Sequence, residues 1–135
     1  MLAKISLVDL LAAVQKKIRD KTGYPCFDHV PKNQESPFYF IELTGSTPRN
    51  TKTMWCETYA VNVHVIAAPD ASSVGVLQLV TALEEALTED IALPEGFELV
   101  MQTCRGLLNL YSEETNEKHA VEGFDFTVCY GYKMK

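Results

Sequence analysis

The 135-residue sequence lacks any apolar run close to the roughly 18 residues that a membrane-spanning helix needs. The N-terminal residues 1–14 are apolar enough to suggest a signal peptide, but Asp9 interrupts the run that such a peptide requires. We therefore expect no membrane association and a protein that is made and folds in the cytoplasm.

Closely spaced metal ligands are also missing. The cysteines form no CxxC pair and none stands next to a histidine: Cys26, Cys56, Cys104 and Cys129. Structural zinc is usually bound by four ligands that come in closely spaced pairs. Proteins of reducing compartments also keep their thiols reduced. We expect free thiols, no bound metal and no cofactor.

The third absence is an excess of basic residues. The sequence has 12 lysines and arginines against 18 acidic residues, a formal net charge of −6. A protein that grips nucleic acid through its phosphates needs a basic face, so the composition disfavours specific binding of DNA or RNA. The apolar fraction of 47% and the charged fraction of 22% are ordinary for a globular protein. The length favours a single domain over residues 1–135.

No set of catalytic residues can be recognised. Asp28 and His29 are neighbours in a predicted strand, where adjacent side chains point to opposite faces. His64 is expected to be a surface histidine. The glycine-containing turns lack the lysine of a phosphate-binding loop. We predict that the protein is not an enzyme. A small hydrolase or transferase that uses a cysteine or histidine stays open as an alternative, and one hyper-reactive thiol would support it.

The clearest pattern in the sequence is the alternation of apolar and polar residues over residues 53–67. From Trp55 onward, one face carries Tyr59, Val61, Val63 and Val65. The other face is mostly polar. This period of two predicts a half-buried strand of an antiparallel sheet, and we expect it to be the centre of the fold.

Two helices and four more strands are predicted around this strand. Apolar residues recur with helical spacing over residues 6–21 and 72–89. Strands are predicted over residues 24–29, 38–43, 97–111 and 118–132, with bulges at Arg105–Gly106 and at Gly123. Short connections favour antiparallel pairing. The predicted fold class is α+β, a mainly antiparallel sheet with two helices packed on one face.

The helix ends carry further signals. Ser6 and Asp9 resemble a capping box at the start of the first helix. The second helix ends in acidic residues that oppose the helix dipole, and a basic partner would explain them: Glu84, Glu85, Glu89 and Asp90. Its N-terminal cap is predicted to be one of three residues: Asp70, Ser72 or Ser73.

Two connections of opposite charge are the predicted contact sites. Residues 44–53, TGSTPRNTKT, have no periodicity and predict a long, mobile loop, and such loops are often functional. Residues 112–117, SEETNE, form an acidic turn. Opposite charges of this kind suit head-to-tail pairing of identical subunits. The predicted partner or oligomer interface consists of Thr47, Arg49, Asn50, Lys52, Trp55, Glu113 and Glu114.

Three stretches carry a resemblance to a known family. They are VQKKIRDKTGYPCFDHVPKNQESPFYFIEL, ETYAVNVHVIAAPDASSVGVLQLVTALEEAL and LYSEETNEKHAVEGFDFTVCYGYK. Together with the order of elements, they resemble the tail completion, or tail-to-head joining, family of long-tailed bacteriophages (the tail terminators of siphophages). The resemblance covers Leu7 to Tyr132.

The resemblance implies a structural role in the virion, at the junction between head and tail. Such a protein forms a homohexameric ring on the end of the tail tube and contacts the tail tube protein. It also presents a surface to the head connector (the stopper or adaptor protein), and DNA passes through its lumen without specific binding. Whether the subunit is a monomer before assembly stays open. A different non-enzymatic α+β binding or scaffold module is the alternative, and a count of six copies per particle would distinguish the two.

Overall fold

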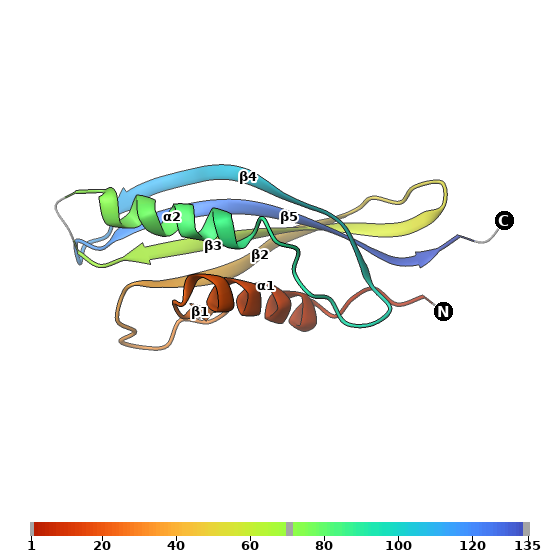
Figure 1. The fold of residues 1–135 in the computed structure, drawn as a ribbon, viewed down its shortest axis with the longest axis horizontal. Coiled ribbons are helices and arrows are strands. Elements are labelled where there is room, and N and C mark those ends of the chain that lie inside the picture. Colours follow the sequence, from red (N-terminus) through yellow and green to blue (C-terminus); the bar gives the residue numbers. More distant parts are fainter. Residues whose placement is uncertain (1, 70–71, 134–135) are drawn as a thin grey trace.

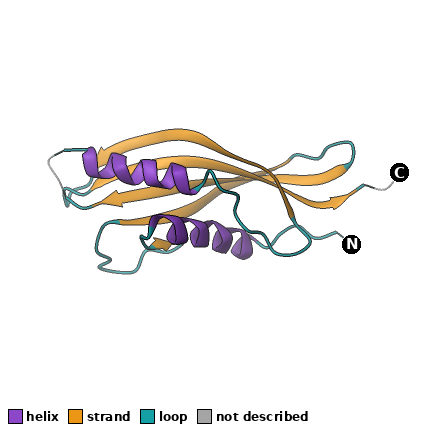
Figure 2. Ribbon diagram, viewed as in Figure 1, coloured by secondary structure: helices purple, strands orange, loops and turns teal. Residues whose placement is uncertain are grey.

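The computed structural model describes residues 2–69 and 72–133 and has two layers. The helices α1 (Leu7–Thr22) and α2 (Val74–Ala86) lie on one face of an elongated, twisted sheet, as Figures 1 and 2 show. The predicted α+β class, with two helices on one face of the sheet, is confirmed. Neither helix is long and apolar enough to cross a bilayer.

The sheet has five strands in the order β1-β2-β3-β5-β4. The short β1 runs parallel to β2, and all other neighbours are antiparallel. The strand predicted to be central is the third of the five, between β2 and β5. The strands are β1 (Cys26–Phe27), β2 (Phe38–Pro48), β3 (Met54–Ala67), β4 (Glu98–Ser112) and β5 (Lys118–Tyr132).

The core lies between the helices and the sheet. The alternation in β3 places Val61, Val63 and Val65 fully inside it. Leu10, Val14 and Ile18 of α1 and Val76, Val80 and Leu83 of α2 pack against the same face. Removal of this much apolar surface from water is the main contribution to the stability of such a fold.

The N-cap positions of both helices fall on predicted residues, but the side-chain contacts differ from the predictions. Ser6 and Ser73 occupy the N-cap positions, but neither side chain makes a capping hydrogen bond, so the predicted capping box is wrong. The hydroxyl of Ser72 accepts a hydrogen bond from the Val74 N–H at 3.1 Å. Asp70 lies outside the described residues.

The acidic segment after α2 finds its basic partner within the same chain. The carboxylate of Glu89 lies 3.5 Å from the Lys17 ammonium and 3.0 Å from that of Lys21, both on α1. These contacts tie the C-terminal ends of the two helices together and require no second protein.

The prediction of a ten-residue mobile loop over residues 44–53 is wrong. β2 continues to Pro48 after a register shift between Leu43 and Gly45. Because both faces of this extension are exposed, its residues carry no apolar alternation. The remaining connection is a short hairpin, in which the Asn50 carboxamide oxygen accepts the N–H of Cys56 at 2.9 Å.

The predicted bulge at Arg105–Gly106 is confirmed. The register of β4 against β5 shifts between Cys104 and Gly106, and Gly106 has a φ of +98°. The bulge predicted at Gly123 lies instead opposite that residue, because β5 stays in continuous register with β3 there. The Arg105 side chain passes directly over Gly123. A Cβ at position 123 would lie 2.7 Å from the Arg105 Cζ, so a larger residue would displace this side chain.

Candidate assembly surfaces

The tip of the β2–β3 hairpin carries the basic half of the predicted interface. Arg49 and Lys52 are exposed, and within the described part of the chain neither forms an ion pair. Thr47 is exposed on β2, opposite Thr58. Asn50 has a structural role, because its side chain holds the hairpin through the Cys56 N–H. The two cations are therefore available to a partner.

Trp55 stands beside this hairpin at the surface. The residue is 36% exposed, and the Lys133 ammonium lies 4.5 Å from the centre of its ring. A cation at this distance over an indole face is attracted by the ring electrons. Trp55 thus adds an accessible aromatic side chain, next to a third positive charge, at the hairpin end of the molecule.

The acidic half of the predicted interface lies at the opposite end of the sheet (Figure 1). The turn between β4 and β5 is closed by the Glu113 N–H, which donates to the Glu117 carbonyl at 2.8 Å. β3 alone has 14 residues, which corresponds to about 45 Å of extended strand. The structure therefore separates the two predicted charge clusters and places Glu113 and Glu114 far from Arg49 and Lys52.

A chain of hydrogen bonds joins the acidic turn to the open face of the sheet, the face without helices. It runs from Glu42 to His64 (3.1 Å), from His64 to His119 (2.9 Å) and from His119 to Glu113 (2.6 Å). The prediction of a surface histidine is wrong, because the His64 side chain is only 16% exposed and stacks on Phe40. The contact depends on the β3–β5 register, which no local pattern reveals.

This chain positions the acidic turn. Glu113 is held by His119, and Glu117 accepts a hydrogen bond from the Thr115 hydroxyl at 2.9 Å, so the carboxylate of Glu114 remains for other contacts. These glutamates line a shallow pocket of about 490 Å³ whose floor includes Phe38 and Phe40. An apolar floor with an acidic rim suits a lysine or arginine side chain of a partner, whose alkyl part can pack on the rings.

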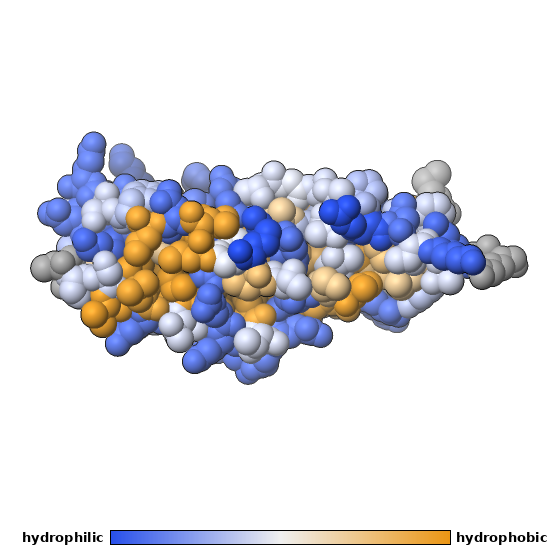
Figure 3. Space-filling view, turned by 90° about the horizontal axis from the view of Figure 1, so that it is seen from above, coloured by the Kyte–Doolittle hydropathy of each residue, from blue (hydrophilic) through white to orange (hydrophobic). Residues whose placement is uncertain are grey.

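An apolar surface extends over α2 and β4. Figure 3 shows it towards the end of the molecule where α2 and the C-terminal half of β4 lie. Leu77 belongs to the apolar residues that recur with helical spacing in this helix, but it is 43% exposed, because α2 covers the sheet with its other side. A shallow pocket of about 320 Å³ lies beside it. We define the β4–α2 apolar surface as Val74, Leu77, Leu107, Leu108 and Leu110, each at least 40% exposed.

The β4–α2 apolar surface includes a strand at the edge of the sheet. β4 is one of the two edge strands, so one side of its backbone has no partner strand in the described chain. Long, exposed and apolar edge strands promote association with other chains, and monomeric proteins usually protect them with charges or prolines. β4 lacks proline and has only Glu98 and Arg105 as charged residues, and the interruptions along it are three register shifts against β5. The surface is therefore suited to contact with another protein subunit.

A carboxyl group is buried on the helix-covered face. Glu122 of β5 is 0% exposed, and burial together with the facing Glu84 carboxyl raises its pKa from 4.5 to about 7. The folded protein then binds more protons than the unfolded chain between pH 4.5 and 7. Its free energy of unfolding should therefore fall as the pH rises through this window, by up to about 3 kcal/mol.

Glu122→Gln tests this pH dependence. The amide is neutral at every pH and can donate a hydrogen bond to Glu84, so the variant should lose the slope and be more stable than the wild type at pH 8. The measurement is urea unfolding at pH 5, 6, 7 and 8 in buffer with EDTA. Glu85→Gln, at an exposed neighbour of Glu84, is the control and should keep the wild-type slope. An unchanged slope in Glu122→Gln would contradict the assignment.

A known protein family matches this chain. The family model described as "putative tail termination protein" matches residues 1–135, which is the whole sequence. The chain belongs to this family of phage tail terminators. The resemblance seen in the sequence is thereby confirmed. Members of the family are structural virion components, so this tail terminator is a structural protein of a phage-like tail.

A solved structure has the same fold. This chain is similar to one in the structure titled "Virion of native gene transfer agent (GTA) particle", with a TM-score of 0.65 and 19% sequence identity. The match covers 94% of this chain and 99% of that chain. No curated protein matches the tail terminator in sequence.

Proposed function

We propose that this tail terminator forms a hexameric ring on the end of the tail tube, stops tube growth and joins the tail to the DNA-filled head. The observation that carries the proposal is the match of the tail termination family to the whole chain. The similar chain from a gene transfer agent virion supports a place within an assembled particle.

The two charged ends of the subunit would contact different partners. The hairpin end presents Arg49 and Lys52, and the turn end presents Glu114 and Glu117, about 45 Å away along the sheet. Subunits that stand side by side in a ring could direct one end to the tail tube protein and the other to the head connector. Complementary charge at each contact would favour the correct partner and speed its encounter.

The β4–α2 apolar surface would be the lateral contact between neighbouring subunits. A ring needs a heterologous contact, in which one surface of a subunit meets a different surface of the next. Burial of exposed leucines would supply the driving force and cover the open edge of the sheet. The net charge of −6 suits a ring whose lumen DNA must traverse, because carboxylates repel phosphate.

Electron microscopy of lysates from a phage that lacks this gene tests the proposal. Filled heads beside separate tails are expected, and abnormally long tails would demonstrate the termination role. The wild-type gene supplied in trans should restore joined particles, in which mass measurement should find six copies. Intact virions without the gene would contradict the proposal and favour a binding or scaffold module of another kind.

A further inference from the structure

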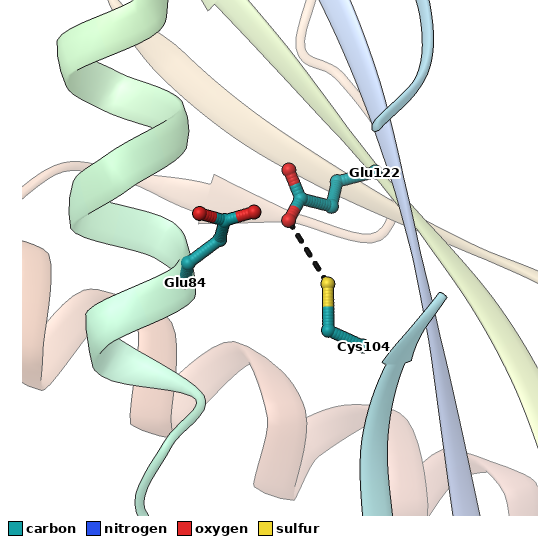
Figure 4. Close-up of side chains that lie close together, drawn as sticks. All are labelled: Glu84, Cys104 and Glu122. Carbon is teal, nitrogen blue, oxygen red and sulfur yellow. Dashed lines mark hydrogen bonds between the residues drawn. The ribbon is translucent and has the colours of Figure 1, made fainter. Parts of the chain in front are cut away.

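Three side chains from three elements converge beside the β4–α2 apolar surface. They are Glu84 of α2, Cys104 of β4 and Glu122 of β5, and Figure 4 shows them pointing towards one another. One donor atom of each lies within 4.8 Å of the donor atoms of the other two. Positions so distant in the sequence meet because α2 packs over the β4–β5 pair.

Glu122, when it is ionised, would be stabilised by a positive partner. It is fully buried, and among the described residues its Oε2 has no hydrogen-bond partner. The side chain that faces Glu122 is the carboxyl group of Glu84, which adds no positive charge. No lysine or arginine of the described chain forms an ion pair with Glu122. A buried carboxylate without a compensating charge is strongly unfavourable. A cation between the two carboxylates would satisfy both.

The third side chain determines which cation fits. Cys104 lies directly before the Arg105–Gly106 bulge, which directs the Gly106 N–H to its sulfur at 3.3 Å. Burial and the neighbouring Glu122 carboxyl raise the pKa of the Cys104 thiol to about 11, and the Gly106 N–H opposes this shift. A bound metal ion would deprotonate the thiol. The bulge is held in place because Arg105 contacts Asp125 at 3.0 Å. The Cys104 thiol also lies 3.0 Å from the Glu122 Oε1, so thiol and carboxylate face the same point.

We propose that Glu84, Cys104 and Glu122 bind one zinc-class divalent metal ion per subunit. A thiolate with two carboxylates is a donor set that zinc accepts, at about 2.3 Å for sulfur and about 2.0–2.2 Å for oxygen. Magnesium and calcium prefer oxygen donors alone. Three protein ligands leave the fourth position to a water molecule, and the exposed sides of Glu84 and Cys104 provide access for it.

Binding of the metal ion requires only small movements of the three side chains. Ligand atoms on a tetrahedral zinc ion are about 3.5 Å apart, so the observed group, within 4.8 Å, must close by about 1 Å. The Glu84 and Cys104 side chains are exposed and free to make that adjustment. The bound ion would fasten α2 to β4 and β5, next to the surface proposed for the ring contact. All three proposed metal ligands come from one subunit, so the metal site does not depend on the proposed contact between subunits.

Titration of the full-length protein with Co²⁺ tests the proposal, because cobalt replaces zinc and reports on its ligands. After removal of metal by a chelator, one equivalent of Co²⁺ should produce the charge-transfer band of a thiolate ligand. Zn²⁺ should then abolish the band and raise the Tm by several degrees. Cys104→Ser should lack the band, and Glu122→Gln should weaken Zn²⁺ binding by about 100-fold.

Two variants serve as matched controls. Cys129→Ser changes another thiol and can keep its hydrogen bond to the Gly131 carbonyl, and Glu85→Gln changes the neighbouring carboxylate on α2. Both should bind Co²⁺ as the wild type does. The proposal fails if folded wild-type protein shows no thiolate band at saturating Co²⁺, or if the band survives in Cys104→Ser. It also fails if Glu122→Gln, shown to be folded by circular dichroism, binds Zn²⁺ with unchanged affinity.

Discussion

Leu77→Glu should abolish the assembly of functional tails while leaving the subunit folded. Leu77 lies in the first turns of α2 and is 43% exposed, and an acidic side chain near a helix N-terminus is compatible with the helix dipole. In the proposed ring, however, the carboxylate would be buried without a partner. Loss of about 3 kcal/mol at each contact weakens each contact by about two orders of magnitude, and six contacts multiply the effect.

Complementation of the deletion phage measures this outcome. Leu77→Glu should give no more infectious particles than an empty vector, and the purified subunit should keep the wild-type circular dichroism spectrum and Tm. Leu77→Met is the matched control, since it keeps an apolar side chain of similar volume, and it should restore infectivity. Full infectivity with Leu77→Glu would show that the β4–α2 apolar surface is not a subunit contact.

Reversal of the hairpin charges should separate heads from tails. Arg49→Glu combined with Lys52→Glu replaces two exposed cations that form no ion pair within the described chain. The fold should therefore be unaffected. A contact that relies on these charges would become repulsive, and like charges placed against each other cost several kcal/mol. Infectivity should fall to the level of the deletion.

Electron microscopy of these lysates also reports which partner the hairpin meets. Filled heads beside tails of normal length would assign the hairpin to the head connector. Abnormally long tails would assign it to the tail tube. The double variant Arg49→Lys and Lys52→Arg keeps both charges and should support joining. Normal virions from the charge-reversed protein would remove the hairpin from the interface.

Substitution is preferable to deletion at this hairpin. Removal of residues 48–51 would take out Pro48, which pairs with Glu57 in the sheet. It would also take out Asn50, whose side chain accepts the Cys56 N–H. A deletion would disturb the register of β2 and β3, and loss of function would then not be specific to the contact.

The predictions that succeeded rest on patterns longer than a turn. The alternation from Tyr59 to Val65 placed β3 at the centre of the sheet, and β5 begins at Lys118 and ends at Tyr132 as predicted. The bulge at Arg105–Gly106 is an exception, since it was predicted from one dipeptide, because glycine is common where a strand departs from regular pleating. These features depend on local backbone preferences and on which face meets the core.

The predictions that failed concern segments whose surroundings lie elsewhere in the chain. The extension of β2 to Pro48 carries no alternation because neither of its faces is covered. Leu77 fits an apolar stripe but faces outward, because only the packing of α2 decides which part of a broad stripe is buried. A short stretch of sequence does not show which other segments of the chain will cover β2 or α2.

Some features of the candidate surfaces follow from the sequence, and others follow only from the tertiary structure. The sequence alone determined the fold class, the central strand and the opposite charges of residues 44–53 and 112–117, since period and composition are local properties. The family was indicated by the resemblance of three stretches to known tail terminators. Only the tertiary structure decided that these charges lie at opposite ends. It alone joined His64 to His119, and it brought Glu84 and Cys104 to Glu122. Those contacts depend on strand register and helix packing, which are set by pairing between residues far apart in the chain.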